Sequence, residues 1–325
     1  MRPTAEPGPA QDPPASSGSG QRTGTVALVG RPNAGKSTLL NALIGDKVAI
    51  VSDKPQTTRN RIVGILSEAR GQAVFFDLPG VHKPLHKMNA RMMQDVRSAL
   101  EEVDLVLHLV DAAAPWGGGE DFLFDLLRPS RPEVMGVLTK IDLVSSKTDL
   151  LPLIARYQER RPGAVVVPIS APDGDGLEAL LEELFARLPE GPPLYPEDLT
   201  STQTERFFVA EVVREKLLER THGELPYTTG VVVDVFDEGE NLLHVEATIY
   251  VERKSQRGIV IGRGGSMVRD VGRAAREELE RVLATRIYLG LRVKAHPRWR
   301  DDPRILVAME PGAADFSEYL EEPPE

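Results

Sequence analysis

The sequence contains no cysteine. Disulfide bonds, thiolate metal sites and cysteine nucleophiles are therefore excluded. The chain also lacks an apolar run of the length that a membrane span requires. Its first residues lack the basic-then-apolar pattern of a secretory signal. We therefore expect an intracellular, cytoplasmic protein.

The distribution of charge divides the chain into two parts. Its 325 residues exceed one typical domain and are enough for two. The net charge is −10, yet residues 251–300 contain thirteen Lys and Arg against five Asp and Glu, which makes this stretch +8 and leaves −18 for the rest. An acidic part and a strongly basic part indicate two tasks, the second of them on a polyanion such as nucleic acid.

Composition and periodicity predict the domain organisation. Residues 1–23 are rich in Pro, Gly, Ser and Gln and are expected to be a disordered tail. In residues 24–190 short β-prone runs alternate with helical patterns, which predicts an α/β domain with a doubly wound, mostly parallel sheet. Residues 191–203 are a Pro-containing linker. Residues 204–300 should form an α+β domain, and residues 301–325 a C-terminal tail with a short helix.

A Gly-rich loop follows the first predicted strand. Residues 30–37 read Gly-Arg-Pro-Asn-Ala-Gly-Lys-Ser and precede a helix-prone stretch. Backbone N–H groups of such a P-loop surround nucleotide phosphates, Lys36 adds a charge for the β- and γ-phosphates, and Ser37 is a Mg²⁺ ligand. The residues predicted to bind here are Gly30, Arg31, Pro32, Asn33, Ala34, Gly35, Lys36, Ser37 and Thr38.

Two further segments should complete the phosphate site. Residues 77–80 (Asp77, Leu78, Pro79 and Gly80) end a predicted strand. Asp77 should point at the Mg²⁺ site, and the Gly80 N–H can bond the γ-phosphate. A Thr hydroxyl in residues 56–59 (Gln-Thr-Thr-Arg) can complete the Mg²⁺ shell only when the γ-phosphate is present, which would make an order–disorder switch. We favour Thr58 over Thr57, so the predicted metal ligands are Ser37, Thr58 and Asp77.

The nucleotide base should be guanine. Residues 139–142 (Thr-Lys-Ile-Asp) end another predicted strand, where Asp142 can accept two N–H bonds from guanine while the Lys140 stem covers the base. Adenine would leave that acceptor unpaired, which can discriminate by roughly 10⁴-fold. The usual first residue of this motif is Asn. Thr139 is shorter, so we expect a weaker tie to the phosphate loop and somewhat weaker affinity. A backbone N–H of Ser170 or Ala171 can bond the guanine carbonyl.

A second Gly-rich turn lies in the basic part. Residues 262–265 (Gly-Arg-Gly-Gly) follow an apolar run, Ile259–Ile261, and open a long predicted helix. A Gly-x-x-Gly turn in this order of elements is typical of a type II KH domain, where missing Cβ atoms let the backbone approach the phosphates of single-stranded RNA. The predicted RNA contacts are Lys254, Arg257, Ile261, Gly262, Arg263, Gly264, Gly265, Arg269 and Arg273. Arg276 shares their helix face.

Together these motifs resemble a known family. The loop at residues 30–37, Gln-Thr-Thr-Arg, Asp-x-Pro-Gly and x-Lys-x-Asp, in this order, resemble the translation-factor-related GTPases. With His82-Lys83-Pro84 and the KH arrangement, residues 25–300 are similar to the Era family of bacterial ribosome-assembly GTPases. The resemblance implies GTP and GDP with Mg²⁺, small-subunit ribosomal RNA at its 3′ end, and the 30S subunit or its precursor as partner. It allows peripheral membrane contact, and we see no stable protein partner.

The resemblance also bears on hydrolysis. Val81 follows Gly80 where Ras-like enzymes have a Gln that orients water, so we expect slow turnover. The family resemblance implies a monovalent cation, typically K⁺, held partly by Asn33. The residues assigned a catalytic role are Lys36, Thr58, Gly80 and Asn33. The leading hypothesis is a GTP-controlled RNA-binding switch, in which GTP orders residues 57–58 and 80–88. The alternatives are a GTPase whose RNA domain only localises it, and a membrane-recruited signalling GTPase.

Overall fold

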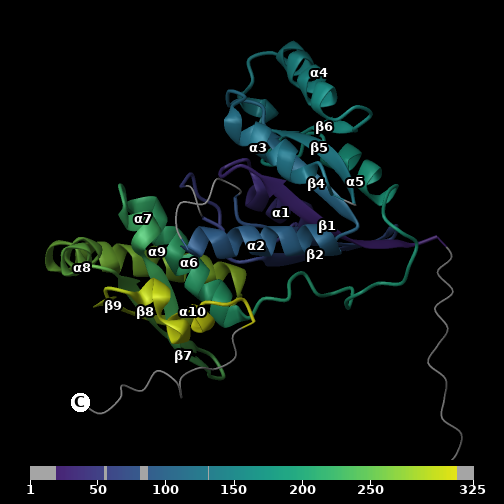
Figure 1. The fold of residues 1–325 in the computed structure, drawn as a ribbon. Helices are drawn as coiled ribbons and strands as arrows, with labels where there is room; N and C mark the ends of the chain where they lie inside the picture. Colours follow the sequence, from purple (N-terminus) through teal and green to yellow (C-terminus); the bar gives the residue numbers. More distant parts are fainter. Residues whose placement is uncertain (1–19, 55–56, 81–86, 131, 313–325) are drawn as a thin grey trace, which may run out of the picture.

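The computed structural model describes residues 20–54, 57–80, 87–130 and 132–312. Figure 1 shows two lobes, the first domain with its sheet at the upper right and the second domain at the lower left. The segment between them runs along the first domain: the backbone N–H groups of Leu194 and Tyr195 donate to Gln72, and Ile65 N–H donates to the Thr200 carbonyl. The predicted linker is thus anchored to the edge of the first sheet.

The first domain is a P-loop-type α/β unit, as predicted. Its described strands form a six-stranded sheet in the order β2-β3-β1-β4-β5-β6, and all neighbours are parallel except β2 and β3. The strands are β1 (Arg22–Gly30), β2 (Ile62–Glu68), β3 (Gly71–Asp77), β4 (Leu105–Asp111), β5 (Glu133–Thr139) and β6 (Val166–Pro168). The helices are α1 (Lys36–Ile44), α2 (Lys87–Glu102), α3 (Gly118–Leu127), α4 (Leu150–Arg160) and α5 (Leu177–Phe185).

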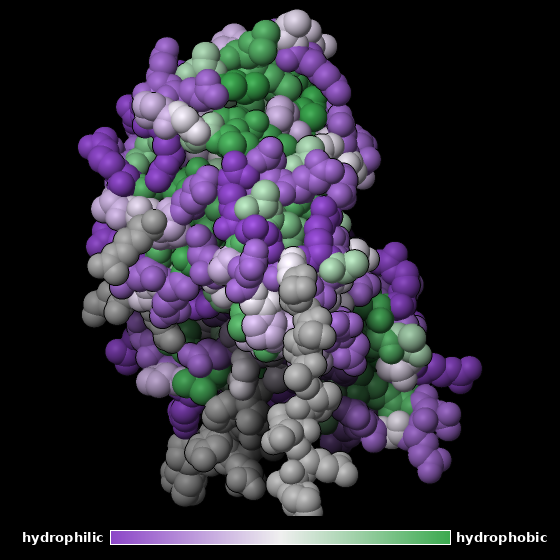
Figure 2. Space-filling model, turned by 90° about the vertical axis from the view of Figure 1, so that its right-hand side faces the viewer, coloured by the Kyte–Doolittle hydropathy of each residue, from purple (hydrophilic) through white to green (hydrophobic). Residues whose placement is uncertain are grey.

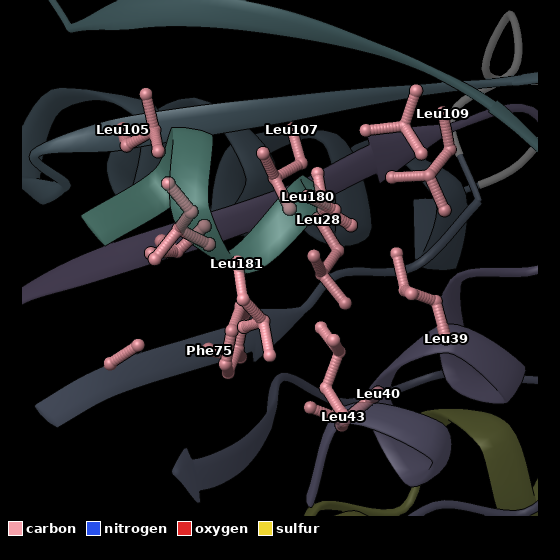
Figure 3. Close-up of a cluster of buried hydrophobic side chains, with 14 of the residues drawn as sticks. Leu28, Leu39, Leu40, Leu43, Phe75, Leu105, Leu107, Leu109, Leu180 and Leu181 are labelled. Carbon is pink, nitrogen blue, oxygen red and sulfur yellow. The ribbon is translucent and has the colours of Figure 1, made fainter. Parts of the chain in front are cut away.

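Helices cover both faces of this sheet, which explains the continuous apolar runs of its strands. Successive residues of one strand face opposite sides of the sheet: Leu28 packs with α1 and α5, whereas Val29 packs with α2 and α3. Figure 3 shows the first of these cores, with leucines from α1 and α5 gathered against the strands. In the space-filling view of Figure 2, hydrophilic side chains cover much of the face, and apolar atoms are visible mainly in the upper half.

The start of β1 corrects the predicted tail. We expected residues 1–23 to be disordered, but β1 begins at Arg22, and residues 1–19 lie outside the described part of the chain. Arg22 is held because its N–H donates to the Arg70 carbonyl and its guanidinium donates to the carbonyls of Ala186 and Leu188. These partners are distant in the sequence, so composition alone could not indicate them.

The second domain has the predicted type II KH order. Among the described residues its sheet is β7-β8-β9, with β7 and β8 antiparallel and β8 and β9 parallel. Its elements are α6 (Glu205–Arg220), α7 (Leu225–Thr228), β7 (Gly230–Glu238), β8 (Leu243–Val251), α8 (Lys254–Ile261), α9 (Ser266–Val282), β9 (Ile287–Ala295) and α10 (Pro303–Ala308). The apolar run Ile259–Ile261 is the end of α8, a helix that we did not predict. Only Gln256 and Val260 of α8 are buried, so its apolar pattern is too sparse to indicate a helix.

Helix α6 belongs to both domains. Phe207 packs in the core of the first domain, and the next residue, Phe208, packs in the core of the second. At the other end of the chain, Trp299 and Ile305 form a small cluster with Val232 on β7, so the predicted short helix, α10, covers the outer side of the second sheet. None of the helices in the described part of the chain is long and apolar enough to cross a bilayer.

Candidate nucleotide and nucleic-acid sites

The phosphate loop joins the end of β1 to the start of α1. Asn33 and Gly35 have φ values of 64° and 86°, a left-handed conformation that Asn and Gly tolerate best. A Cβ on Gly30 would lie 2.8 Å from the Leu109 carbonyl oxygen, so only Gly fits there. The loop lines a cavity of about 300 Å³ together with residues 50–53, Thr57, Thr58, Gly80 and Lys140. Of the predicted residues of the loop, Gly30, Arg31 and Ala34 do not line this cavity, whereas the other six do.

Lys36 is buried at the bottom of this loop. Its Nζ donates to the carbonyls of Gly30 at 3.4 Å and Arg31 at 3.2 Å. Burial lowers the pKa of Lys36, while the charges of Asp77 and Glu120 oppose that shift. The Lys36 ammonium therefore lies near two carboxylates, Asp77 and Glu120, and is held by two backbone carbonyls.

Ser37, Thr58 and Asp77 converge beside it. The Ser37 hydroxyl donates to Asp77 Oδ2 at 2.5 Å, the Thr58 hydroxyl lies 3.2 Å from the same oxygen, and the two hydroxyls are 3.0 Å apart. Burial raises the pKa of Asp77, although Lys36 opposes this. The buried Asp77 Oδ1 has no hydrogen-bond partner in the described part of the chain. Two hydroxyls and a carboxylate with one unsatisfied oxygen are hard oxygen ligands of the kind that fits Mg²⁺.

Residues 56–59 are the predicted switch segment, and its two threonines differ in their surroundings. The Thr57 hydroxyl donates to the Lys54 carbonyl at 2.6 Å, away from Asp77, whereas Thr58 joins the metal-site oxygens. Gln56 and residues 81–86, which include Val81 and His82-Lys83-Pro84, lie outside the described residues. Gly80 is described: a Cβ there would lie 2.8 Å from Pro32 Cα, so this segment passes directly against the phosphate loop. Leu78 and Pro79 are buried behind it.

The guanine-side residues follow β5 and β6. A tie to the phosphate loop is present, because the Thr139 hydroxyl donates to the Ala34 carbonyl at 2.9 Å. The short side chain suffices because the loop approaches closely, with the position of a Cβ on Gly35 only 3.8 Å from Thr139 Cβ. Lys140 has φ 60° and its Nζ lies 2.7 Å from Asp111, while Asp142 is exposed at the start of a short 3-10 turn.

Of Ser170 and Ala171, only one has a backbone N–H that is not used within the hydrogen bonds of the described loop. The Ser170 N–H donates to the Asp175 carbonyl at 2.9 Å, and the Ser170 hydroxyl donates to Asp173 at 2.8 Å. Because the Ser170 N–H is used within the loop, Ala171 is the better candidate donor to a guanine carbonyl.

The Gly-x-x-Gly turn connects α8 to α9. Gly262, Gly264 and Gly265 have φ values of 74°, 59° and 80°, and a Cβ on Gly262 would lie 2.7 Å from the Met267 nitrogen. The Cβ of a residue at 264 would meet open space. The turn thus presents bare backbone at the N-terminus of α9, which favours an anion.

A groove between α9 and β9 follows the turn. Its cavity of about 310 Å³ is lined by Val268, Arg269, Gly272, Arg273, Arg276, Leu289 and Leu291. The apolar residues suit base faces, and the exposed arginines suit phosphates. The predicted contacts Lys254, Arg257 and Ile261 lie on α8 and do not line this cavity, and Arg257 donates to the Val293 carbonyl at 3.0 Å. Arg263, exposed in the turn itself, links the two regions.

The second domain contacts the switch segment and the residues just before it, and the sequence did not predict these contacts. Arg214 of α6 donates to the Thr57 carbonyl, and Arg59 donates to the Thr229 carbonyl at 2.8 Å. Glu215 accepts from the Val51 N–H at 2.7 Å and pairs with Lys47, which also pairs with Glu278 of α9. The signal in the sequence was weak: Arg214 and Glu215 are charged residues inside a helix that is apolar on most of its sides, and both are buried.

This geometry defines a class of protein: a P-loop GTP-binding domain joined to a KH nucleic-acid-binding domain. Two family models match accordingly, a 50S ribosome-binding GTPase over residues 25–140 and a KH domain over residues 224–300. The chain is 46% identical over 286 residues to the GTPase Era of Heliobacterium modesticaldum, which covers 88% of this chain and 95% of that protein. The chain therefore belongs to the Era family of GTPases.

Further relatives agree. The GTPase Era of Geobacter metallireducens is 46% identical over 287 residues, covering 88% of this chain and 96% of that protein. Two solved structures each match with a TM-score of 0.85 and 36% identity over 90% of this chain and 100% of theirs. One is an Aquifex aeolicus Era variant bound to GDP·AlF₄⁻, and the other is Era with MgGDPNP and nucleotides 1506–1542 of 16S ribosomal RNA. The predictions of the family, the fold class, GTPase activity and the cofactors GTP, GDP and Mg²⁺ are confirmed.

Proposed function

We propose that the chain is a slowly hydrolysing GTP switch that binds the single-stranded 3′ end of small-subunit ribosomal RNA through its KH domain and acts in maturation of the 30S subunit. The observation that carries this is the contact of Arg214 with the Thr57 carbonyl, because it joins the helix that supports the KH domain to the residue before a candidate Mg²⁺ ligand. A solved relative holds MgGDPNP and 16S ribosomal RNA together, which supports the same pair of ligands here.

The GTPase site uses the residues assembled around the phosphate loop. Mg²⁺, when bound, supplies charge for the β- and γ-phosphates, and Ser37, Thr58 and Asp77 are the residues that would hold it. Lys36 binds the phosphates through its ammonium, and the Gly80 N–H bonds the γ-phosphate. Asn33 donates its side-chain N–H to the Asp53 carbonyl at 2.6 Å, so its amide oxygen is the atom that can ligate K⁺.

Guanine recognition rests on Asp142, with the Lys140 stem over the base and the Ala171 N–H at the carbonyl. Thr139 keeps the base-binding loop on the phosphate loop through Ala34. For RNA, the backbone from Gly262 to Gly265 approaches the phosphates and the groove arginines follow the strand. No residue is assigned as a general base, which agrees with slow turnover.

We further propose a cytoplasmic location, because the 30S subunit is the partner. Peripheral membrane contact through α9 is disfavoured, since three of its apolar residues, Val271, Ala275 and Leu279, are fully buried in the second core. The proposed functional units are residues 24–190 for GTP and 204–300 for RNA, with 191–203 as the linker.

Reciprocal binding measurements test the switch. Coupling requires that RNA raise GTP affinity by the same factor by which a GTP analogue raises RNA affinity. We expect this for the full chain, GDPNP with Mg²⁺, and an oligoribonucleotide of the 16S 3′ end, measured by calorimetry. Equal RNA affinities in the GDP and GDPNP states would show a GTPase whose RNA domain only localises it. Binding to anionic vesicles that survives saturating RNA would favour the membrane alternative.

A further inference from the structure

A buried acidic side chain lies behind the phosphate loop, outside all the motifs described above. Glu120, in the first turn of α3, is 2% exposed. Its Oε1 lies 3.6 Å from Arg31 Nη1, and its Oε2 lies 3.6 Å from His108 Nε2. His108 is itself buried and its Nδ1 lies 3.1 Å from the Tyr157 hydroxyl. A buried carboxylate is costly unless it is paired, and Arg31 is the cation that lies beside this one.

Arg31 is the phosphate-loop residue that this carboxylate holds. The Arg31 stem lies flat against the start of α3, since a Cβ on Gly119 would be only 3.0 Å from Arg31 Nε. Its guanidinium also donates to the Pro115 carbonyl at 3.5 Å. The side chain of Arg31 is thus held at the start of α3, and Arg31 does not line the cavity beside the loop.

The backbone of Arg31 faces the opposite way. Its carbonyl accepts from Lys36 Nζ at 3.2 Å and from the Ala34 N–H at 3.2 Å, so it sets both the closure of the loop and the place of the ammonium. The carboxylate of Glu120 therefore acts on the loop through the side chain of Arg31.

We propose that Glu120 is a positioning residue for GTP binding: it fixes Arg31 on α3, and the Arg31 carbonyl then fixes Lys36 for the phosphates. Glu120 itself does not touch the nucleotide. The inference rests on the proposed GTP site and adds a residue on which the shape of its phosphate loop depends.

The test is a double-mutant cycle in the full chain. We expect Glu120→Gln and Arg31→Met each to raise the dissociation constant of GTP with Mg²⁺ by about tenfold, which is about 1.4 kcal/mol. Since both substitutions remove the same contact, the double variant should bind GTP no more weakly than the single variant with the lower affinity. The Michaelis constant should rise with the dissociation constant while kcat stays within about twofold, because the effect is on ground-state and transition-state binding alike.

Asp121→Asn is the matched control, because it removes the same charge from the next residue of α3. Asp121 is half-exposed and pairs with Arg160, on the outer side of the helix. GTP affinity should be unchanged in this variant.

Wild-type affinity in Glu120→Gln, or multiplying effects in the double variant, would overturn the inference and leave the proposed function intact. If Glu120→Gln fails to fold, the Arg31→Met variant is the test, since wild-type GTP affinity in that variant would also overturn the inference. Failure of the wild-type chain to bind GTP would instead overturn the proposed function.

Discussion

The guanidinium of Arg214 donates to the carbonyl of Thr57, the residue that precedes Thr58 in the switch segment. Thr58 shares Asp77 with Ser37, so a single peptide separates the candidate Mg²⁺ site from helix α6. A shift of Thr58 would therefore act on the contact between the Thr57 carbonyl and α6. This link is short enough to couple the two ligands.

Replacing Arg214 should uncouple them. In the wild-type chain we expect RNA to raise GTP affinity by about 5- to 150-fold, the usual range for coupled sites. In Arg214→Met the factor should fall to near one, because the carbonyl of Thr57 loses its donor. Arg220→Met is the control on the same helix, since Arg220 pairs with Glu219 and the Lys216 carbonyl within α6. Full coupling in Arg214→Met would contradict this route.

Changing Asp142 should change the preferred base. Asp142→Asn inverts the donor and acceptor pattern that guanine meets, so GTP affinity should fall by about 100-fold or more and xanthosine triphosphate should bind better. Competition binding with both nucleotides measures this. Asp149→Asn, at an exposed position nearby, should leave the preference unchanged. Unaltered GTP affinity in Asp142→Asn would show that another residue recognises the base.

The two threonines of the switch should respond differently. Thr58→Ala removes a hydroxyl from the Mg²⁺ site and should lower kcat by about 100-fold, comparable to losing one stabilising group at a transition state. Thr57→Ala removes only the hydrogen bond to the Lys54 carbonyl and should stay within about threefold. Single-turnover hydrolysis at saturating Mg²⁺ is the measurement. The reverse order of effects would make Thr57 the ligand.

A charge in the Gly-rich turn should remove RNA binding. The side chain of Gly264→Asp would enter open space at φ 59°, so the fold should persist while the carboxylate repels phosphates. We expect RNA affinity to fall by about 100-fold or more and GTP hydrolysis without RNA to continue. Gly223→Asp is closely matched, at φ 67° with open space around it, but it lies outside the turn. Retained RNA binding in Gly264→Asp would place the RNA elsewhere.

Acid should weaken the joint between the domains through Glu278. Burial alone would raise the pKa of Glu278, but hydrogen bonds from Lys216 and Lys47 outweigh it and lower that pKa below its ordinary 4.5. A lowered pKa contributes stability above pH 4.5 that is lost as the pH falls through the folded-state value. At pH 7 the melting temperature of Glu278→Gln should lie about 2–5 °C below wild type.

As the pH falls below 4.5 and through the folded-state pKa, that gap should narrow, because the wild-type side chain of Glu278 then becomes uncharged, like Gln. Thermal melts across this range, with the exposed neighbour variant Glu277→Gln as control, measure the difference. A gap that is constant with pH would mean that Glu278 contributes by packing rather than by charge.

Much of both sites could be predicted because the motifs are local. The phosphate loop and the Gly-x-x-Gly turn are each set by glycines within a few residues, and the strand ends that carry Asp77 and Asp142 follow from apolar runs. Glu120 and Arg214 could not be predicted, since their meaning depends on Arg31 and Thr57, which are distant in the sequence. The reach of Thr139 to the phosphate loop could not be judged from the sequence, because the closeness of the two loops is a tertiary property.

The adjoining phenylalanines of α6 have a practical consequence. Because Phe207 fills the nucleotide lobe and Phe208 fills the RNA lobe, no cut between them yields two intact halves. A fragment that stops before α6 loses the buried ring of Phe207, a defect of about 3–5 kcal/mol. Isolated fragments of either domain would therefore be destabilised, and the two domains should unfold together on heating.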